Sequence, residues 1–280
     1  MTNDTICRVG GSLIQHGDIN QRIYLMHLDP KDLPCIIAEL DRMAGEHGYS
    51  KIFVKIPVTH SRQFLEAGYT EEARVKGMFH GTEDGLFLTK YPDPKRREIA
   101  DPDSDLIGDV LEKAQERAGE HCAVTLPTPL VCRECDPDDA EALADLYREV
   151  FATYPFPITD PEYLKSTMES HIRYWAIWDG DSPVAASSAE MAPAERNVEM
   201  TDFATLPACR GYRLSSCLLT QMEETMKREG FAVAYTICRA ESYPINITFS
   251  RTGYRFGGTL RNNTQICGGF ESMNIWYTRL

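Results

Sequence analysis

The chain has 280 residues, of which 42% are hydrophobic and 25% charged, a composition typical of a soluble globular protein with room for two domains. Its formal net charge of −13 argues against a nucleic-acid-binding protein, because such proteins present a basic face. No segment approaches the roughly 18 uninterrupted apolar residues of a membrane span. The start, Met1-Thr-Asn-Asp-Thr5, has neither the basic end nor the apolar run of a signal peptide, which predicts a cytoplasmic protein.

The cysteines indicate free thiols rather than a disulfide framework, since there are nine of them, an odd number. Cys132 and Cys135 have a spacing that also occurs in zinc and redox sites. They lie on a predicted strand, where residues three apart face opposite sides, and no second Cys or His pair has ligand spacing. We therefore predict a protein without a metal site.

Two stretches of the chain share one order of elements. The first has a strand from Arg22, a helix over 35–46 and a strand over 51–56, followed by Phe64-x-x-x-Gly68-Tyr69. The second has the same kinds of element, with Phe249-x-x-x-Gly253-Tyr254 at the corresponding place. This agreement predicts an internal repeat, although common α/β architecture accounts for part of it.

The repeat divides the chain into three predicted parts. Residues 1–92 form a degenerate first module, residues 93–129 a helical connector, and residues 130–280 the complete second module. The connector contains a helix over 101–119 and ends in the proline-rich stretch 125–129.

The second module is predicted to mix strands and helices along the chain. Its helix from Leu214 has an apolar stripe, basic residues in its last turn and Gly230 as its stop. Its other elements are a strand and helix over 131–151, strands near 174–178, 184–190 and 231–238, a strand from 198, a short helix ending at 249, and strands near 254–260 and 273–277.

Arg210-Gly211 stands between a strand and the helix that begins at Leu214. A helix start exposes unpaired N–H groups and the positive end of the helix dipole, and a glycine lets a diphosphate approach the backbone. The alternative is an ordinary capped helix. The first module has Asp29-Pro-Lys-Asp-Leu-Pro34 at this place, whose acids repel a diphosphate and whose prolines lack N–H donors. Only the second module is therefore expected to bind a cofactor.

These elements, with Arg210-Gly-Tyr-Arg-Leu-Ser215, resemble the GNAT family of N-acetyltransferases over roughly residues 130–280. The resemblance implies an α/β fold with a central mixed sheet, preceded here by a degenerate half-module, and acetyl-CoA as co-substrate. Arg213 and Ser215 stand where the family prefers small residues. By resemblance the cofactor-binding residues are Phe203, Ala204, Thr205, Arg210, Gly211, Tyr212, Arg213, Leu214, Ser215 and Asn246.

Three further segments resemble the beta-lysine N6-acetyltransferase branch of the family: Tyr154-Pro-Phe-Pro-Ile158, residues 253–264 and residues 268–276. This resemblance implies a small cationic amino acid as acceptor and a compatible solute as product, and a homodimer is compatible with it. In such a site Tyr154 and Phe156 would wall the aliphatic chain and Glu271 would pair with the beta-amine. The candidates for holding the carboxylate are Arg261, Asn262 and Asn263, although Asn262-Asn263 has an ordinary turn as its alternative.

Acetyl transfer to an amine needs an uncharged nitrogen, and an amine with a pKa near 10.4 is neutral at pH 7 only about once in 10³ molecules. By resemblance Glu199 is the base, with Asp202 as one alternative and a purely structural role for both acids as the other. Strand alternation places these acids on opposite faces, so we expect at most one to face the reaction. A backbone N–H near Phe203 or Ala204 would bind the oxyanion. The family's tyrosine proton donor is replaced by Phe249, with Tyr243 and Tyr254 as the nearest substitutes.

Other functions remain open from the sequence. The acceptor is alternatively a polyamine, lysine or a protein amine. A non-catalytic acyl-CoA sensor fits the altered glycine pattern and the missing tyrosine, and it predicts binding without turnover. A dinucleotide site is a weaker interpretation, because Gly-x-Gly-x-x-Gly is absent from the sequence.

Overall fold

The structure is a computed structural model that describes residues 4–120, 125–266 and 268–280. The first half contains β1 (Thr5–Val9), β2 (Ser12–Gly17), β3 (Arg22–His27), α1 (Cys35–His47), β4 (Lys51–Pro57), α2 (Ser61–Glu66), β5 (Thr70–Phe79) and β6 (Glu83–Lys90). Helix α1 buries Ile36, Leu40 and Ala44 at helical spacing against this part of the sheet. It ends at Gly48, whose φ of 68° is the left-handed conformation that glycine adopts without strain.

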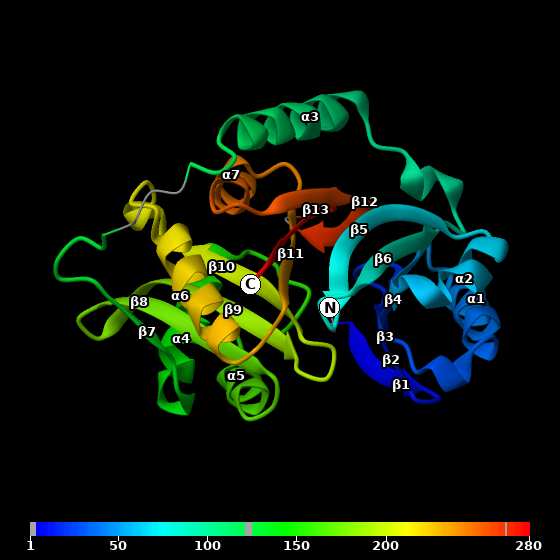
Figure 1. Ribbon diagram of the computed structural model, residues 1–280, viewed down its shortest axis with the longest axis horizontal. Helices are drawn as coiled ribbons and strands as arrows, with labels where there is room; N and C mark the ends of the chain where they lie inside the picture. The colour runs from blue at the N-terminus through cyan, green and yellow to red at the C-terminus, as the bar shows by residue number, and fades with distance from the viewer. Residues whose placement is uncertain (1–3, 121–124, 267) are drawn as a thin grey trace.

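A long helix, α3 (Asp101–Glu116), connects the halves. It packs on the second half's α7 (Tyr243–Arg251) and lies across the top of the view in Figure 1. The helix ends three residues before the predicted end of 101–119. Part of the predicted connector, residues 121–124, lies outside the described residues.

The second half follows the predicted order of elements. It contains β7 (Val131–Glu134), α4 (Ala140–Val150), α5 (Pro161–Met168), β8 (Ile172–Asp179), β9 (Ser182–Ala192), β10 (Asn197–Thr205), α6 (Leu214–Arg228), β11 (Val233–Arg239), α7, β12 (Arg255–Ile266) and β13 (Gly269–Arg279). Helix α6 begins at Leu214, as predicted, whereas β12 and β13 are longer than predicted. Short 3-10 turns lie at 30–32, 58–60, 94–97, 137–139 and 207–209.

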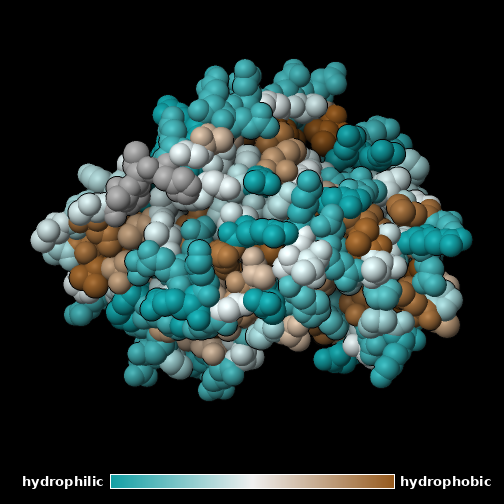
Figure 2. Space-filling view, in the orientation of Figure 1, coloured by the Kyte–Doolittle hydropathy of each residue, from teal (hydrophilic) through white to brown (hydrophobic). Residues whose placement is uncertain are grey.

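One mixed sheet runs through the described part of the molecule in the order β1-β2-β3-β4-β6-β5-β12-β13-β11-β10-β9-β8-β7. Helices cover both of its faces: α4 and α5 pack on one side of the second half and α6 on the other (Figure 1). The predicted α/β fold with a central mixed sheet is confirmed. In Figure 2 hydrophilic residues cover much of the visible face, with hydrophobic residues in separate patches between them.

The halves have the same topology. In the first half the strands lie side by side in the order β1-β2-β3-β4-β6-β5, and in the second half in the equivalent order β8-β9-β10-β11-β13-β12. The last strands of these two series, β5 and β12, pair with each other and join the halves. Gly258 pairs with Ala73 at this junction, where an added Cβ would lie 2.2 Å from the Glu72 carbonyl oxygen. The shared element order supports the predicted repeat, and the domain boundaries themselves stay a prediction.

The junction has its own hydrophobic core, built from both halves. Val75 and Phe87 of the first half pack in one cluster with Val233, Tyr235 and Ile275 of the second. Each of these side chains is at least 98% buried. The first half therefore covers apolar surface of the second, which brings its strands β3 and β4 close to the site described below.

Candidate active site

Strands β10 and β11 diverge and open a cleft. They pair in parallel only where Asn197–Glu199 meets Val233–Tyr235; beyond this point β11 stays with β13 and β10 with β9. A cavity of about 620 Å³ lies in the cleft, lined by side chains from both strands and from the start of α6. A β-bulge in β10 between Thr201 and Ala204 interrupts the ladder to β9, and Asp202 there has a φ of 56°.

The start of α6 lines one end of the large cavity. Arg213 caps the helix in left-handed conformation without a side-chain capping bond, and Gly211 has a φ of 91° with open space around the position of a Cβ. Helix-start N–H groups and cationic side chains favour a bound anion here, so the residues present fit the diphosphate of a CoA molecule. The predicted cofactor residues that line the cavity are Phe203, Thr205, Arg210, Gly211, Arg213, Leu214 and Ser215.

Three predicted cofactor residues lie outside the cavity lining. Ala204 is buried in β10, and Tyr212 is 59% exposed. Asn246 is fully buried: its side-chain oxygen accepts hydrogen bonds from Trp276 at 2.8 Å and Asn274 at 2.9 Å. Its side-chain nitrogen donates to the carbonyl of Arg239 at 2.9 Å. Asn246 thus ties α7 to β11 and β13.

A second, smaller cavity of about 90 Å³ adjoins the first, and both are lined by Tyr154, Thr201, Asp202, Ile237, Ile266 and Met273. It has three carboxyl groups, from Glu190, Glu199 and Asp202, and one guanidinium, from Arg22. Aromatic side chains form much of the remaining wall: Tyr24, Phe53, Tyr154, Phe156, Tyr163 and Tyr174. The structure therefore brings the predicted chain-walling residues Tyr154 and Phe156 together with both predicted acids.

Glu199 and Asp202 line the same cavity, so the expectation that alternation separates them is wrong. The register is regular from Glu199 to Thr201, but Asp202 lies in the bulge itself, where its φ of 56° breaks the alternation of the strand. Burial raises the pKa of Glu199 to about 8, helped by the charge of Glu190, while Lys55 and a hydrogen bond with Tyr235 oppose the shift.

Asp202 is held in a hydrogen-bond network. Burial raises its pKa, and the hydroxyls of Ser188 and Tyr154, which each donate to one of its oxygens at 2.5 Å, oppose that rise. Both of its oxygens are thus occupied. Glu199 is the less constrained of the two acids and the better placed to accept a proton from a ligand.

The predicted proton donors do not reach either cavity. The Tyr243 hydroxyl donates a hydrogen bond to Asp109 of α3. Tyr254 is 97% buried against Phe249, with ring centroids 4.9 Å apart. Among the described residues, Tyr154 is the tyrosine that lines the larger cavity.

The predicted carboxylate binders lie in a second bulge, within β12, rather than in a turn. Arg261 is exposed and lines neither cavity. Asn262 has a φ of 43° and donates to the carbonyls of Arg96 and Glu98, whereas Asn263 lines the small cavity.

Glu271, predicted to pair with a substrate amine, instead forms a bidentate ion pair with Arg239, with both N–O distances 2.7 Å. It lines neither cavity. Arg239 itself lines the larger cavity, so this pair lies at the edge of the cleft.

The first half contributes four residues to the small cavity that the sequence did not predict there: Arg22, Tyr24, Met26 and Phe53. The first three alternate along β3, so they share one face of the strand. The sequence signal that could have found Arg22 is its place on the same strand face as Tyr24 and Met26, where a charged residue is unusual. Glu190, at the end of a predicted strand, was missed as well. Lys55 of β4 also approaches the site, since its Nζ donates to the Tyr235 hydroxyl at 3.0 Å.

The comparisons with known proteins agree with this geometry. The model of the acetyltransferase (GNAT) family matches residues 140–254. A beta-lysine N(6)-acetyltransferase of Methanococcus maripaludis is 38% identical over 274 residues, which is 98% of each chain. The chain belongs to the GNAT family. It is an N-acetyltransferase, and the predicted family is confirmed.

Two other relatives also align over most of the chain. The N-acetyltransferase YodP of Bacillus subtilis is 30% identical over 96% of each chain. A beta-lysine N(6)-acetyltransferase of Methanosarcina mazei is 32% identical over 86% of this chain and 95% of its own. The similarity to these relatives therefore extends over both halves of the chain, beyond residues 140–254 that the family model matches.

Among the described residues, no helix is long and apolar enough to cross a membrane. In the same residues, no group of three or more His, Cys, Asp or Glu side chains is placed to hold a metal ion.

Proposed function

We propose that this enzyme transfers the acetyl group of acetyl-CoA to the side-chain amine of beta-lysine, in the cytoplasm, and so produces a compatible solute. The observation that carries the proposal is the small cavity beside the cleft, in which acids and one cation face the same space. The names of two relatives, at 38% and 32% identity, support beta-lysine as the acceptor.

In this proposal acetyl-CoA occupies the larger cavity. The start of α6, with Arg210 and Gly211, holds the diphosphate, and the diverging strands β10 and β11 flank the pantetheine arm. The bulge leaves Asp202 and Phe203 without register partners in β9, and a backbone N–H near Phe203 or Ala204 would donate to the oxyanion of the tetrahedral intermediate.

Glu199 would accept the proton of the incoming ammonium group. With a pKa of about 8, it lies about 2.4 pKa units below an amine at 10.4, which corresponds to roughly 3 kcal/mol for the transfer. An ordinary glutamate near 4.3 would face a gap of about 6 units, or roughly 8 kcal/mol. The buried surroundings of Glu199 therefore make it a stronger base than an exposed carboxylate.

The shape of the site favours a small acceptor over a protein. The first half covers the small cavity with β3 and β4, and a volume of about 90 Å³ suits a compound of few atoms. Opposite charges on its walls match a zwitterionic diamine.

The test is to supply purified enzyme with acetyl-CoA and one acceptor at a time: beta-lysine, lysine, spermidine or a lysine-containing peptide. Thiol release gives the rate and mass spectrometry locates the acetyl group. We expect the highest kcat/KM with beta-lysine, acetylated at its side-chain amine. Preferred turnover of spermidine or the peptide would contradict the proposed acceptor, and acetyl-CoA binding without turnover of any amine would favour a sensor.

A further inference from the structure

Arg22 of β3 brings a buried cation from the first half into the acceptor cavity. Its side chain lines that cavity together with Tyr24 and Met26, and the residue is only 4% exposed. The guanidinium carbon lies 5.7 Å from the centre of the Tyr24 ring and 5.8 Å from that of Phe53. Two aromatic rings therefore lie beside the guanidinium in the wall of the cavity.

The guanidinium is incompletely satisfied by the protein. Its Nη1 donates to the Asn263 carbonyl at 2.6 Å and to the Thr264 hydroxyl at 3.0 Å, and its Nη2 reaches Gln15 at 3.5 Å. Its Nε is buried and has no hydrogen-bond partner among the described residues, and the same is true of the side-chain oxygen of Asn263. Burial lowers the pKa of Arg22 to about 10, and the charge of Asp4 opposes this shift.

No carboxylate forms an ion pair with Arg22 within the described ranges. Asp4 acts only at longer range, and its nearest hydrogen-bond contact is with the Asn20 side chain at 2.5 Å. A buried charge without a direct counter-ion is costly unless a ligand supplies the opposite charge.

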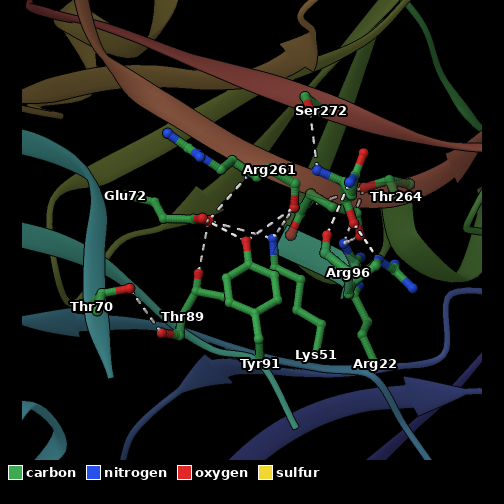
Figure 3. A network of polar contacts seen from close by, with 12 residues as sticks. Arg22, Lys51, Thr70, Glu72, Thr89, Tyr91, Arg96, Arg261, Thr264 and Ser272 are labelled. Atoms are coloured by element: carbon green, nitrogen blue, oxygen red, sulfur yellow. Dashed lines mark hydrogen bonds and ion pairs between the residues drawn. The ribbon is translucent and has the colours of Figure 1, made fainter. Parts of the chain in front are cut away.

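Two other cations show what a purely structural role looks like in this region. Figure 3 shows Lys51, Arg96 and Arg22 converging on the bulge of β12. Lys51 donates to the carbonyl of Arg261, Arg96 to that of Asn262 and Arg22 to that of Asn263. Lys51 and Arg96 line neither cavity.

The guanidinium nitrogens of Arg96 are all used inside the protein. Its Nε donates to the Asn262 carbonyl at 2.7 Å, Nη1 to the Ser50 hydroxyl at 2.8 Å and Nη2 to the Asn20 carbonyl at 2.9 Å. Arg22 differs from Arg96 in two ways: its Nε has no hydrogen-bond partner among the described residues, and the residue lines the acceptor cavity. The bulge thus holds Arg22 in place without consuming all of its hydrogen-bonding capacity.

We propose that Arg22 binds the carboxylate of the acceptor, with Asn263 beside it, so that the first half selects diamines that carry a carboxylate. A carboxylate is the planar anion that a guanidinium recognises best. With this end fixed at Arg22, the distal amine extends toward Glu190 and Glu199 on β9 and β10. This assignment rests on the proposed function, because it presumes a small zwitterionic acceptor.

The experiment compares beta-lysine with its carboxamide, which has both amines but no anion. For the wild-type enzyme we expect kcat/KM to be on the order of 100-fold higher for beta-lysine, because the carboxamide leaves the buried cation uncompensated. In Arg22→Gln the value for beta-lysine should fall about 100-fold, mainly through KM, while the value for the carboxamide changes less than about threefold. The preference would then nearly disappear.

Arg96→Gln is the matched control, because it removes the same kind of carbonyl contact one residue earlier in the bulge. It should lower the thermal midpoint and leave the preference for beta-lysine unchanged. Arg22→Lys, which keeps the charge without the planar fork, should retain part of the preference and serves if Arg22→Gln fails to fold.

Two results would overturn the assignment to Arg22. One is a wild-type enzyme that acetylates both compounds equally well, and the other is an equal loss for both compounds in either Arg22 variant. In either case the acetylation of beta-lysine, and with it the proposed function, would stand. Failure of the wild-type enzyme to acetylate beta-lysine at all would instead refute the proposed function.

Discussion

At the scale of single residues, Glu199 shows how surroundings set a chemical role. Its pKa of about 8 follows first from burial and then from the neighbouring charge of Glu190. Asp202 lines the same cavity, but hydroxyl donors occupy both of its oxygens. Two carboxyl groups three residues apart therefore have different capacities to accept a proton.

Glu199→Gln should lower kcat at pH 7 by about 10²-fold or more, because the variant cannot remove the ammonium proton. The wild-type kcat/KM should rise with pH and level off once the pH passes the Glu199 pKa of about 8, because the carboxylate form then predominates. In the variant it should keep rising about tenfold per pH unit toward the amine's own pKa. Initial rates between pH 6 and 10 give both profiles.

Asp202→Asn is the control for this experiment, since it changes the other acid of the same cavity. It should keep the plateau, whatever its effect on the absolute rate. If Asp202→Asn loses the plateau and Glu199→Gln keeps it, the base is Asp202.

Lys51 gives a stability prediction. Burial lowers its pKa to about 7, so the folded state releases this proton near pH 7 while the unfolded state keeps it to about 10.5. Between these values the unfolded state binds more protons, and stability rises with pH by roughly 1 kcal/mol per unit from this group. Lys51→Met removes that dependence. Urea unfolding at pH 7 and pH 9 should therefore show the wild type gaining stability relative to the variant at the higher pH.

Lys76 of β5 is an exposed lysine and serves as the comparison. Lys76→Met makes the same substitution at an exposed position and so controls for the loss of a lysine side chain. A constant difference between the wild type and Lys51→Met at both pH values would show that Lys51 keeps its proton in the folded state.

At the scale of elements, the start of α6 and the equivalent connection of the first half have diverged. The loop before α1 carries Asp32, whose carboxylate accepts hydrogen bonds from the backbone N–H groups of Gly11 at 3.0 Å and Ser12 at 2.8 Å. The connection before α1 thus carries an acid that is bound to the turn between β1 and β2. The start of α6 has Arg210 and Gly211 instead, facing an open cavity.

We therefore expect one acetyl-CoA site per chain. Arg210→Asp should weaken binding at least tenfold, because it replaces a cation at the diphosphate position with an anion. Lys31→Asp makes the same change in the equivalent loop of the first half and should leave the affinity unchanged. Isothermal titration measures stoichiometry and affinity together; two sites per chain, or unaltered binding by Arg210→Asp, would be incompatible with this placement.

At the scale of the whole molecule, strand pairing and a shared core join the two halves. They share a continuous sheet through β5 and β12, and the junction core includes Phe87 of the first half and Tyr235 of the second. Lys51 and Arg96 further clamp the β12 bulge to the first half (Figure 3). We expect the halves to unfold together.

The three tryptophans, at 175, 178 and 276, all lie in the second half, so their fluorescence reports its unfolding. Leu40→Ala in α1 creates a cavity in the core of the first half, which should cost about 2–5 kcal/mol. If the halves unfold together, the fluorescence midpoint in urea should fall as far as the midpoint from circular dichroism. Leu65→Ala, at a 47% exposed position, should shift neither. A fluorescence midpoint that Leu40→Ala leaves in place would mean independent unfolding.

The sequence by itself determined the elements and their order, because local patterns specify them. The apolar stripe and Gly230 predicted α6, and the helix begins at Leu214 as its pattern indicated. The repeat predicted matching halves, and both have the same strand order. The resemblance in the second half predicted the family, which the relatives confirm.

Only the tertiary structure decided which side chains share the acceptor cavity. A bulge in β10 placed Asp202 beside Glu199 against the alternation of the strand, and a bulge in β12 separated Asn263 from Arg261. Arg22 meets the Asn263 carbonyl across 241 residues of sequence. Local periodicity reports the face of an element, but not the partner that the folded chain packs against it, so contacts of this range are decided by the packing of the two halves.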